Sequence, residues 1–114
     1  MAELTRLLFV DDEPNFLHLV EVYFDWGGHA AVNTTSDPDQ ACKIAASKQP
    51  NFIFVDTIMP GIDGDNLARG LKEQAPDATL VSLSGLAREA TWAEVSLVKS
   101  GDVLETIRAL ISKS

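Results

Sequence analysis

The sequence has little of what secreted or membrane-spanning proteins need. Cys42 is the only cysteine among the 114 residues, so no internal disulfide can form, which fits a reducing cytoplasm. The longest apolar runs, residues 7–10 and 52–55, are far shorter than the roughly 20 residues of a membrane-spanning helix. The N-terminal residues lack the basic start and the apolar stretch of a signal peptide. We therefore expect a cytoplasmic protein.

Basic residues are also scarce. Nine Lys and Arg stand against 17 Asp and Glu, which gives a formal net charge of −8. This balance argues against direct binding of nucleic acid, which depends on clustered Lys and Arg, and against docking on an anionic membrane. Because the chain contains no repeat, low-complexity tract or linker-like stretch, we expect residues 1–114 to form one domain around one core.

Short apolar runs rich in branched side chains alternate with longer segments of helical period. The expected strands are residues 7–10, 30–34, 52–55, 79–83 and 95–98, with about five helices between and after them. This alternation predicts an α/β fold with right-handed crossovers. We expect a flavodoxin-like, five-stranded parallel sheet in the order 2-1-3-4-5, with helices on both faces.

The helices carry their own start and stop residues. The first is expected to begin at Pro14, to end at Gly27-Gly28 and to include Trp26 on its apolar side. Ser36 or Asp37 caps the second. Only ten residues, 85–94, separate the fourth strand from the fifth, at the lower limit of a helical crossover of roughly 10–12 residues. The fourth helix should therefore be short or irregular.

Polar residues stand where the apolar runs end. They are Asp11, Asp12 and Glu13 after the first strand, Asp56 at the end of the third, Ser84 after the fourth and Lys99 after the fifth. Ligands of parallel α/β sheets bind outside these carboxyl ends. If the first and third strands are neighbours, three carboxylates converge and repel one another unless a cation compensates. Oxygen-only ligands without His or Cys favour Mg²⁺.

A hydroxyl and an ammonium complete this expected site. Ser84 and Lys99, on its opposite side, would bind the remaining oxygens of a phosphoryl group. A carboxylate nucleophile, a divalent metal and a polar clamp together are the equipment for accepting a phosphoryl group on Asp56.

These residues lie in short blocks of specific sequence. The blocks are LLFVDDEP at residues 7–14, FIFVD at 52–56, MPGIDG at 59–64, Ser84-Gly85 and Lys99. In them the chain resembles the CheY-like receiver domains of bacterial two-component response regulators, and the resemblance covers essentially its whole length. It implies that Asp56 accepts a phosphoryl group from a phosphohistidine on a sensor histidine kinase or a histidine phosphotransfer protein. The phosphorylated receiver would then change the activity of a partner or of an attached output module, or would act through a homodimer.

The resemblance also implies a role for each site residue. Asp11, Asp12 and Asp56 would hold Mg²⁺, with Asp12 and Asp56 as direct ligands and Asp11 acting through water, and the backbone carbonyl of Ile58 would supply a further ligand. Ser84 would bond to a phosphoryl oxygen, and Lys99 would pair with the phosphoryl group. Asp63 is expected to enter a helix rather than bind metal, and Glu13 to favour the helix dipole.

Three departures from the family concern the output face. Ser96 stands where receivers carry an aromatic switch residue, and Ser100 replaces the proline that usually follows the lysine. We therefore expect a trans peptide after Lys99. The third departure is the short fourth helix. They favour one alternative, a receiver-like protein-binding module that works without phosphorylation.

Another alternative is an Mg²⁺ phosphohydrolase with Asp56 as nucleophile. It is disfavoured because Ile58 occupies the position where such hydrolases carry an acid, so we expect no enzyme beyond self-phosphorylation. A flavin-binding flavodoxin is disfavoured as well, since an acidic first loop repels phosphate. Trp92 is open to two interpretations, as an anchor for a partner or as packing over the fourth helix.

Overall fold

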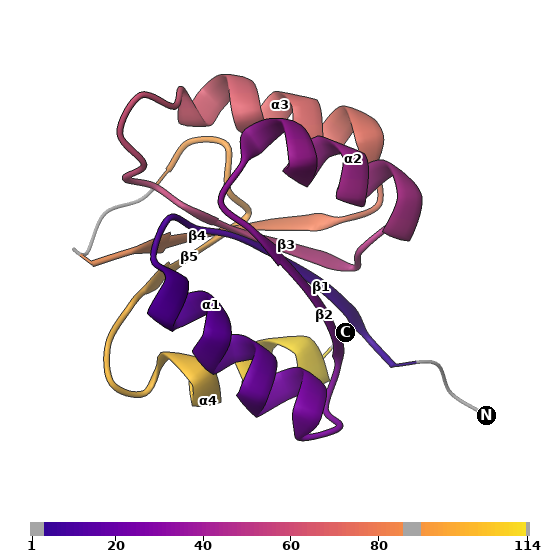
Figure 1. Cartoon of the computed structure of the whole chain (residues 1–114), viewed down its shortest axis with the longest axis vertical. Helices are drawn as coiled ribbons and strands as arrows, with labels where there is room; N and C mark the ends of the chain where they lie inside the picture. The colour runs from indigo at the N-terminus through magenta and orange to yellow at the C-terminus, as the bar shows by residue number, and fades with distance from the viewer. Residues whose placement is uncertain (1–3, 86–89, 114) are drawn as a thin grey trace.

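A twisted parallel sheet forms the middle layer of the molecule (Figure 1). The structure, a computed structural model, describes residues 4–85 and 90–113. The strands are β1 (Arg6–Val10), β2 (Ala31–Thr35), β3 (Phe52–Asp56), β4 (Thr79–Ser84) and β5 (Val95–Val98). Their spatial order is β2-β1-β3-β4-β5, and every neighbouring pair is parallel. The predicted fold class and strand order are confirmed.

Helices cover both faces of the sheet (Figure 1). On one face lie α1 (Pro14–Val20), its π-helical continuation η1 (Glu21–Trp26) and α4 (Val103–Ser112). The other face carries α2 (Pro38–Lys48) and α3 (Gly64–Gln74). Within the described residues, none of these helices is long and apolar enough to cross a membrane.

Two apolar clusters hold the layers together. Because side chains alternate along a strand, β1 and β3 feed both clusters and are buried on both faces. On the α1 side, the Phe9 ring stacks on Phe54 with centroids 4.5 Å apart and meets the edge of Phe16 at 6.2 Å. This stack lies directly beneath the carboxyl ends of β1 and β3, so it fixes the position of the residues that follow them.

Side-chain caps and glycines set the ends of the helices. The Asp37 carboxylate accepts the Asp39 N–H at 3.0 Å and begins α2, while Asp63 caps α3 in the same way. A Cβ on Gly27 would lie 2.3 Å from the Tyr23 carbonyl oxygen, and Gly28 has a positive φ of 78°. A side chain does not fit at Gly27, and glycine favours the positive φ at Gly28, so the first helical segment ends there.

The helices differ from the prediction in two respects. Instead of about five, the described residues form four α-helices and the η1 segment. Residues 90–94 make a turn at 91–92 without a helix, and the rest of the expected fourth helix falls on residues 86–89, outside the described ranges. Trp26, expected on the apolar side, is 73% exposed. The wider π-helical turn brings it out of phase with Phe16 and Val20.

Candidate functional site

The carboxyl ends of three strands deliver charged side chains to one face of the sheet. Asp11 continues the alternation of Phe9 along β1, and Asp56 continues that of Phe54 along β3. Lys99 follows β5 two residues after Leu97, which packs against the same apolar cluster. The sheet therefore directs two acids and one base toward the start of α1.

The acids meet at this end of the sheet. One carboxylate oxygen each from Asp11, Asp12 and Asp56 lies within 4.8 Å of the other two. Asp11 and Asp56 are buried, whereas Asp12 is exposed. The structure thus brings together the three carboxylates that the sequence placed at neighbouring strand ends, and it leaves the cluster open to solvent on the side of Asp12.

Lys99 supplies the countercharge. Its Nζ lies 2.6 Å from Asp11 Oδ2, 2.7 Å from Glu13 Oε1 and 3.5 Å from Asp56 Oδ2. The ammonium also stands 4.7 Å from the centre of the Phe16 ring. Burial by itself lowers the pKa of Lys99, but the hydrogen bonds to Asp11 and Glu13 outweigh burial and raise this pKa above its usual value. Lys99 is therefore charged at neutral pH.

Asp11 carries the electrostatic cost of the cluster. Burial raises the pKa of its carboxyl from 3.8 to about 6, although the bonds from Lys99 and from the Glu13 N–H oppose that rise. A carboxylate that is costly to ionise in the folded protein gains from a further cation beside it. The electrostatics of the site thus favour cation binding.

A tight turn after β3 orients Asp56. Its Oδ1 accepts the Ile58 N–H at 3.0 Å, and the Thr57 N–H donates to the Leu83 carbonyl at 2.9 Å. These bonds tie the turn to β4 and leave Oδ2 on the side of Lys99. The Ile58 side chain is 49% exposed and takes no part in holding Asp56.

Ser84 occupies the end of β4 and is fully buried. It follows Leu83, the register partner of Asp56, by one residue. Its carbonyl oxygen accepts the Lys99 N–H at 2.7 Å. The two residues expected to clamp a phosphoryl group are thereby joined through their backbones, next to the strand that ends at Asp56.

Sequence reasoning missed the contact between Glu13 and Lys99. Glu13 was expected only to favour the helix dipole, but its carboxylate forms an ion pair with Lys99 across 86 positions of the chain. The available indication was its place two residues after Asp11. Without the position of Lys99 relative to α1, that spacing does not identify the partner.

The residues of the cluster fit a hard divalent cation. The donors are carboxylate oxygens alone, which Mg²⁺ prefers over the nitrogen and sulfur ligands typical of Zn²⁺. Oxygens on opposite sides of one Mg²⁺ stand about 4 Å apart, since each metal–oxygen bond is about 2.1 Å. The observed limit of 4.8 Å is close to this span. Small side-chain movements are therefore enough for Asp11, Asp12 and Asp56 to share one ion.

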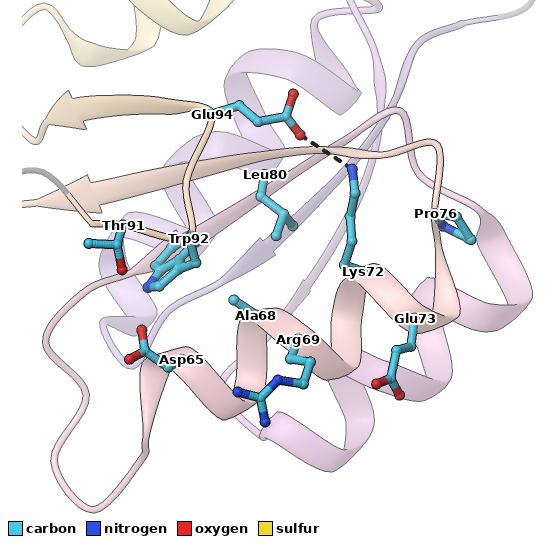
Figure 2. A pocket seen from close by; sticks show the side chains of 10 residues that line it. All are labelled: Asp65, Ala68, Arg69, Lys72, Glu73, Pro76, Leu80, Thr91, Trp92 and Glu94. Carbon is cyan, nitrogen blue, oxygen red and sulfur yellow. Dashed lines mark hydrogen bonds and ion pairs between the residues drawn. The ribbon is translucent and has the colours of Figure 1, made fainter.

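A cavity lies apart from the acids, between α3 and the connection to β5 (Figure 2). It measures about 680 Å³, and Ala68, Leu80 and Trp92 form its apolar lining. The ion pair of Lys72 with Glu94, at 3.3 Å, bridges its two sides. Trp92 packs against the apolar cluster on this face of the sheet. Within the described residues, Trp92 thus packs on α3 and β4.

The chain matches a known family over most of its length. The family model for the response regulator receiver domain matches residues 7–105. The chain belongs to this family. Its CheY-like fold and the resemblance seen in its strand-end motifs are confirmed together.

Relatives of this receiver domain include regulators of known structure. Response regulator SaeR of Staphylococcus aureus is 27% identical over 86 residues, which are 75% of this chain and 37% of the relative. The chain thus spans well under half the length of the curated relatives it matches. The structure of response regulator TrrA from Thermotoga maritima in complex with Mg²⁺-BeF has a TM-score of 0.80 and 26% identity, covering 96% of this chain and 97% of that one.

A second structure contains a kinase. The complex of histidine kinase ThkA with TrrA matches with a TM-score of 0.78 and 26% identity, over 96% of this receiver domain and 97% of that chain. In this family context, two departures are visible at β5. Ser96 is half-buried and stands opposite Ser82 in the sheet, and the described residues contain no cis peptide bond, so the bond after Lys99 is trans as expected.

Proposed function

We propose that this receiver domain accepts a phosphoryl group on Asp56 and then switches a partner, an attached output module or a homodimer. One observation carries the proposal. The Asp56 carboxylate lies in a cluster with Asp11 and Asp12 and 3.5 Å from the ammonium of Lys99. The nucleophilic carboxylate of Asp56 therefore lies beside both a candidate cation site and a fixed positive charge.

Each group has a chemical task. An Asp56 oxygen attacks the phosphorus of a phosphohistidine, and a P–O bond forms as the P–N bond breaks. The electron pair of the P–N bond stays on the ring nitrogen, and the imidazole leaves neutral because its other nitrogen already carries a proton. Asp11, Asp12 and Asp56 would hold Mg²⁺, with the Ile58 carbonyl as a further ligand. When bound, the metal supplies positive charge to the transferring oxygens. Ser84 and Lys99 would bind the other phosphoryl oxygens.

The partner follows from the same chemistry. We propose a sensor histidine kinase or a histidine phosphotransfer protein as the phosphoryl donor, in the cytoplasm. The complex of ThkA with TrrA, whose receiver is 26% identical to this one, supports a kinase as partner. We propose no enzyme activity beyond self-phosphorylation, because Ile58, two residues after Asp56, brings an apolar side chain and no acid to that position.

A second candidate function is a protein-binding module that works without phosphorylation. It is favoured by β5, where Ser96 provides no aromatic ring to change its packing. It is also favoured by the connection before β5, whose described residues 90–94 form no helix. Both features lie on the side of the fold where receivers are expected to be read out, and neither affects the acids.

Phosphorylation by a small donor separates these functions. The protein is incubated with Mg²⁺ and acetyl phosphate and then examined by intact mass for one base-labile phosphoryl group. Asp56→Asn should abolish the adduct. Asp63→Asn, which changes a neighbouring acid but keeps a capping side chain, should not.

Three other outcomes would change the assignment. Absence of an adduct on the wild-type protein refutes the phosphoacceptor function. An adduct that alters neither partner binding nor oligomeric state favours the phosphorylation-independent module. Repeated hydrolysis of free phosphate esters favours a phosphohydrolase.

A further inference from the structure

Glu13 is the one acid at this site without a task in the proposed chemistry. It directly precedes α1 with the extended backbone of a helix cap, yet its side chain bonds to no N–H of the helix. Its Oε1 instead lies 2.7 Å from Lys99 Nζ. Its own N–H donates to Asp11 Oδ1 at 2.9 Å, so Asp11, Glu13 and Lys99 form a closed ring of contacts.

Of the three carboxylates that contact Lys99, Asp56 makes the longest contact. The 2.7 Å contact to Glu13 is a charge-assisted hydrogen bond, and the 2.6 Å contact to Asp11 is a close ion pair. The 3.5 Å to Asp56 is too long for such a bond. Before phosphorylation, the ammonium expected to clamp the phosphoryl group is therefore held by other carboxylates.

The two holders of Lys99 differ in how easily they release it. The Asp11 side chain is 1% exposed, so separation from Lys99 would leave a buried carboxylate without its countercharge. The Glu13 side chain is 61% exposed, so its carboxylate is rehydrated when the ion pair opens. A phosphoryl group on Asp56 would add negative charge and three acceptor oxygens on the other side of Lys99. Glu13 is thus the contact that this group displaces at least cost.

We propose that Glu13 is a positioning residue that holds Lys99 away from Asp56, and that Lys99 exchanges Glu13 for a phosphoryl oxygen when Asp56 is modified. The inference rests on the proposed phosphoacceptor function. Glu13 lowers the affinity of the site for a phosphoryl group, because the group must first take Lys99 from it. The negative charge of Glu13 acts through Lys99 and not through direct repulsion of the phosphoryl oxygens.

A double-mutant cycle with a phosphoryl mimic tests this role. Beryllofluoride binding at saturating Mg²⁺ is measured by calorimetry on the wild-type protein, Glu13→Gln, Lys99→Met and the double variant. Methionine preserves an apolar stem over Phe16. Because the Glu13 side of this ion pair is exposed and easily rehydrated, Glu13→Gln should tighten beryllofluoride binding about two- to five-fold. In the Lys99→Met background, the same change should have no effect.

A matched variant controls for charge alone. Asp65→Asn removes one exposed acid from the first turn of α3, beside a small pocket that Thr57 lines next to the site. Among the described residues, Lys99 forms ion pairs with Asp11, Glu13 and Asp56 and not with Asp65, so we expect the beryllofluoride affinity of Asp65→Asn to equal that of the wild-type protein. A gain equal to that of Glu13→Gln would overturn the proposal.

The remaining outcomes separate the inference from the proposed function. If the wild-type protein binds no beryllofluoride, the phosphoacceptor function fails and the inference fails with it. If it binds, but Glu13→Gln binds no more tightly or gains equally without Lys99, only the inference is overturned. If Lys99→Met binds too weakly to measure, the NMR signal of Lys99 Nζ decides. In metal-free Glu13→Gln it should already be shifted toward its beryllofluoride-bound position, and an unshifted signal refutes the proposal.

Discussion

Replacing Asp11 by asparagine measures what the acidic site costs the fold. Asp11 is fully buried, and burial raises the pKa of its carboxyl from 3.8 to about 6. Between these pH values, the folded protein keeps a proton that the unfolded chain has released. Stability therefore falls as pH rises through this window, and the full penalty is present above pH 6.

The size of the penalty follows from the difference between the two pKa values. The rise from 3.8 to about 6 corresponds to an energy on the order of 3 kcal/mol at neutral pH, since one pKa unit is about 1.4 kcal/mol. Asparagine has a similar shape and no charge, but it cannot form the ion pair with Lys99. Lys99 still has Glu13 as its ion-pair partner in this variant. We expect Asp11→Asn to raise the free energy of unfolding by on the order of 2 kcal/mol and Tm by roughly 10 °C.

Urea unfolding followed by circular dichroism from pH 4 to 8, without divalent metal, provides the measurement. The advantage of Asp11→Asn should be largest above pH 6 and should vanish near pH 4, where the wild-type carboxyl is protonated. Asp77→Asn, an exposed acid in the turn before β4, should stay within about 0.5 kcal/mol of the wild-type protein. A variant less stable than wild type at pH 7, or an advantage that grows on acidification, would refute the reasoning.

Two further substitutions test the framework around the site. Phe9→Ala removes a fully buried ring that stacks on Phe54 at 4.5 Å, and we expect a loss of about 3–5 kcal/mol in urea unfolding. A loss under about 1 kcal/mol would show that the stack is not part of a packed core. Asp37→Ala removes the side-chain cap of α2 and should cost about 1 kcal/mol, whereas Asp37→Asn should retain most of that stability. Equal losses for both Asp37 variants would contradict the capping role.

The strand ends were predictable because each depends on local sequence. Phe9 and Phe54 lie in apolar runs that end in acids, and a parallel sheet brings such ends to one edge. Strand order followed from the alternation of strands and helices together with the family resemblance. The convergence of Asp11 and Asp56 therefore needed no knowledge of side-chain packing.

Other features depend on tertiary structure and could not be derived from local patterns. The position of Trp26 changes with a π-helical turn that no residue pattern announces. The connection before β5 was expected to hold a short or irregular helix, and its described residues 90–94 form none. The packing of Trp92 on α3 and β4 depends on the surface that the neighbouring elements leave open. In each case, a neighbouring element decides between conformations that the local sequence permits equally.

The choice of carboxylates that Lys99 contacts is the clearest feature that depends on tertiary structure. This choice affects both the stability of the fold and the proposed function. The sequence placed one ammonium near several carboxylates, but the choice among them depends on distances and burial. Asp11 holds Lys99 because its charge is buried, and Glu13 reaches the same ammonium from the solvent side. Three carboxylates then share the charge of Lys99, and Asp12 adds a fourth negative charge beside Asp11 and Asp56, so the folded site is short of positive charge before any ligand arrives. Because the buried carboxylate of Asp11 lowers the stability of the metal-free protein, binding of a divalent cation beside it stabilises the fold by a correspondingly larger amount. Asp11→Asn removes the buried negative charge and therefore both effects.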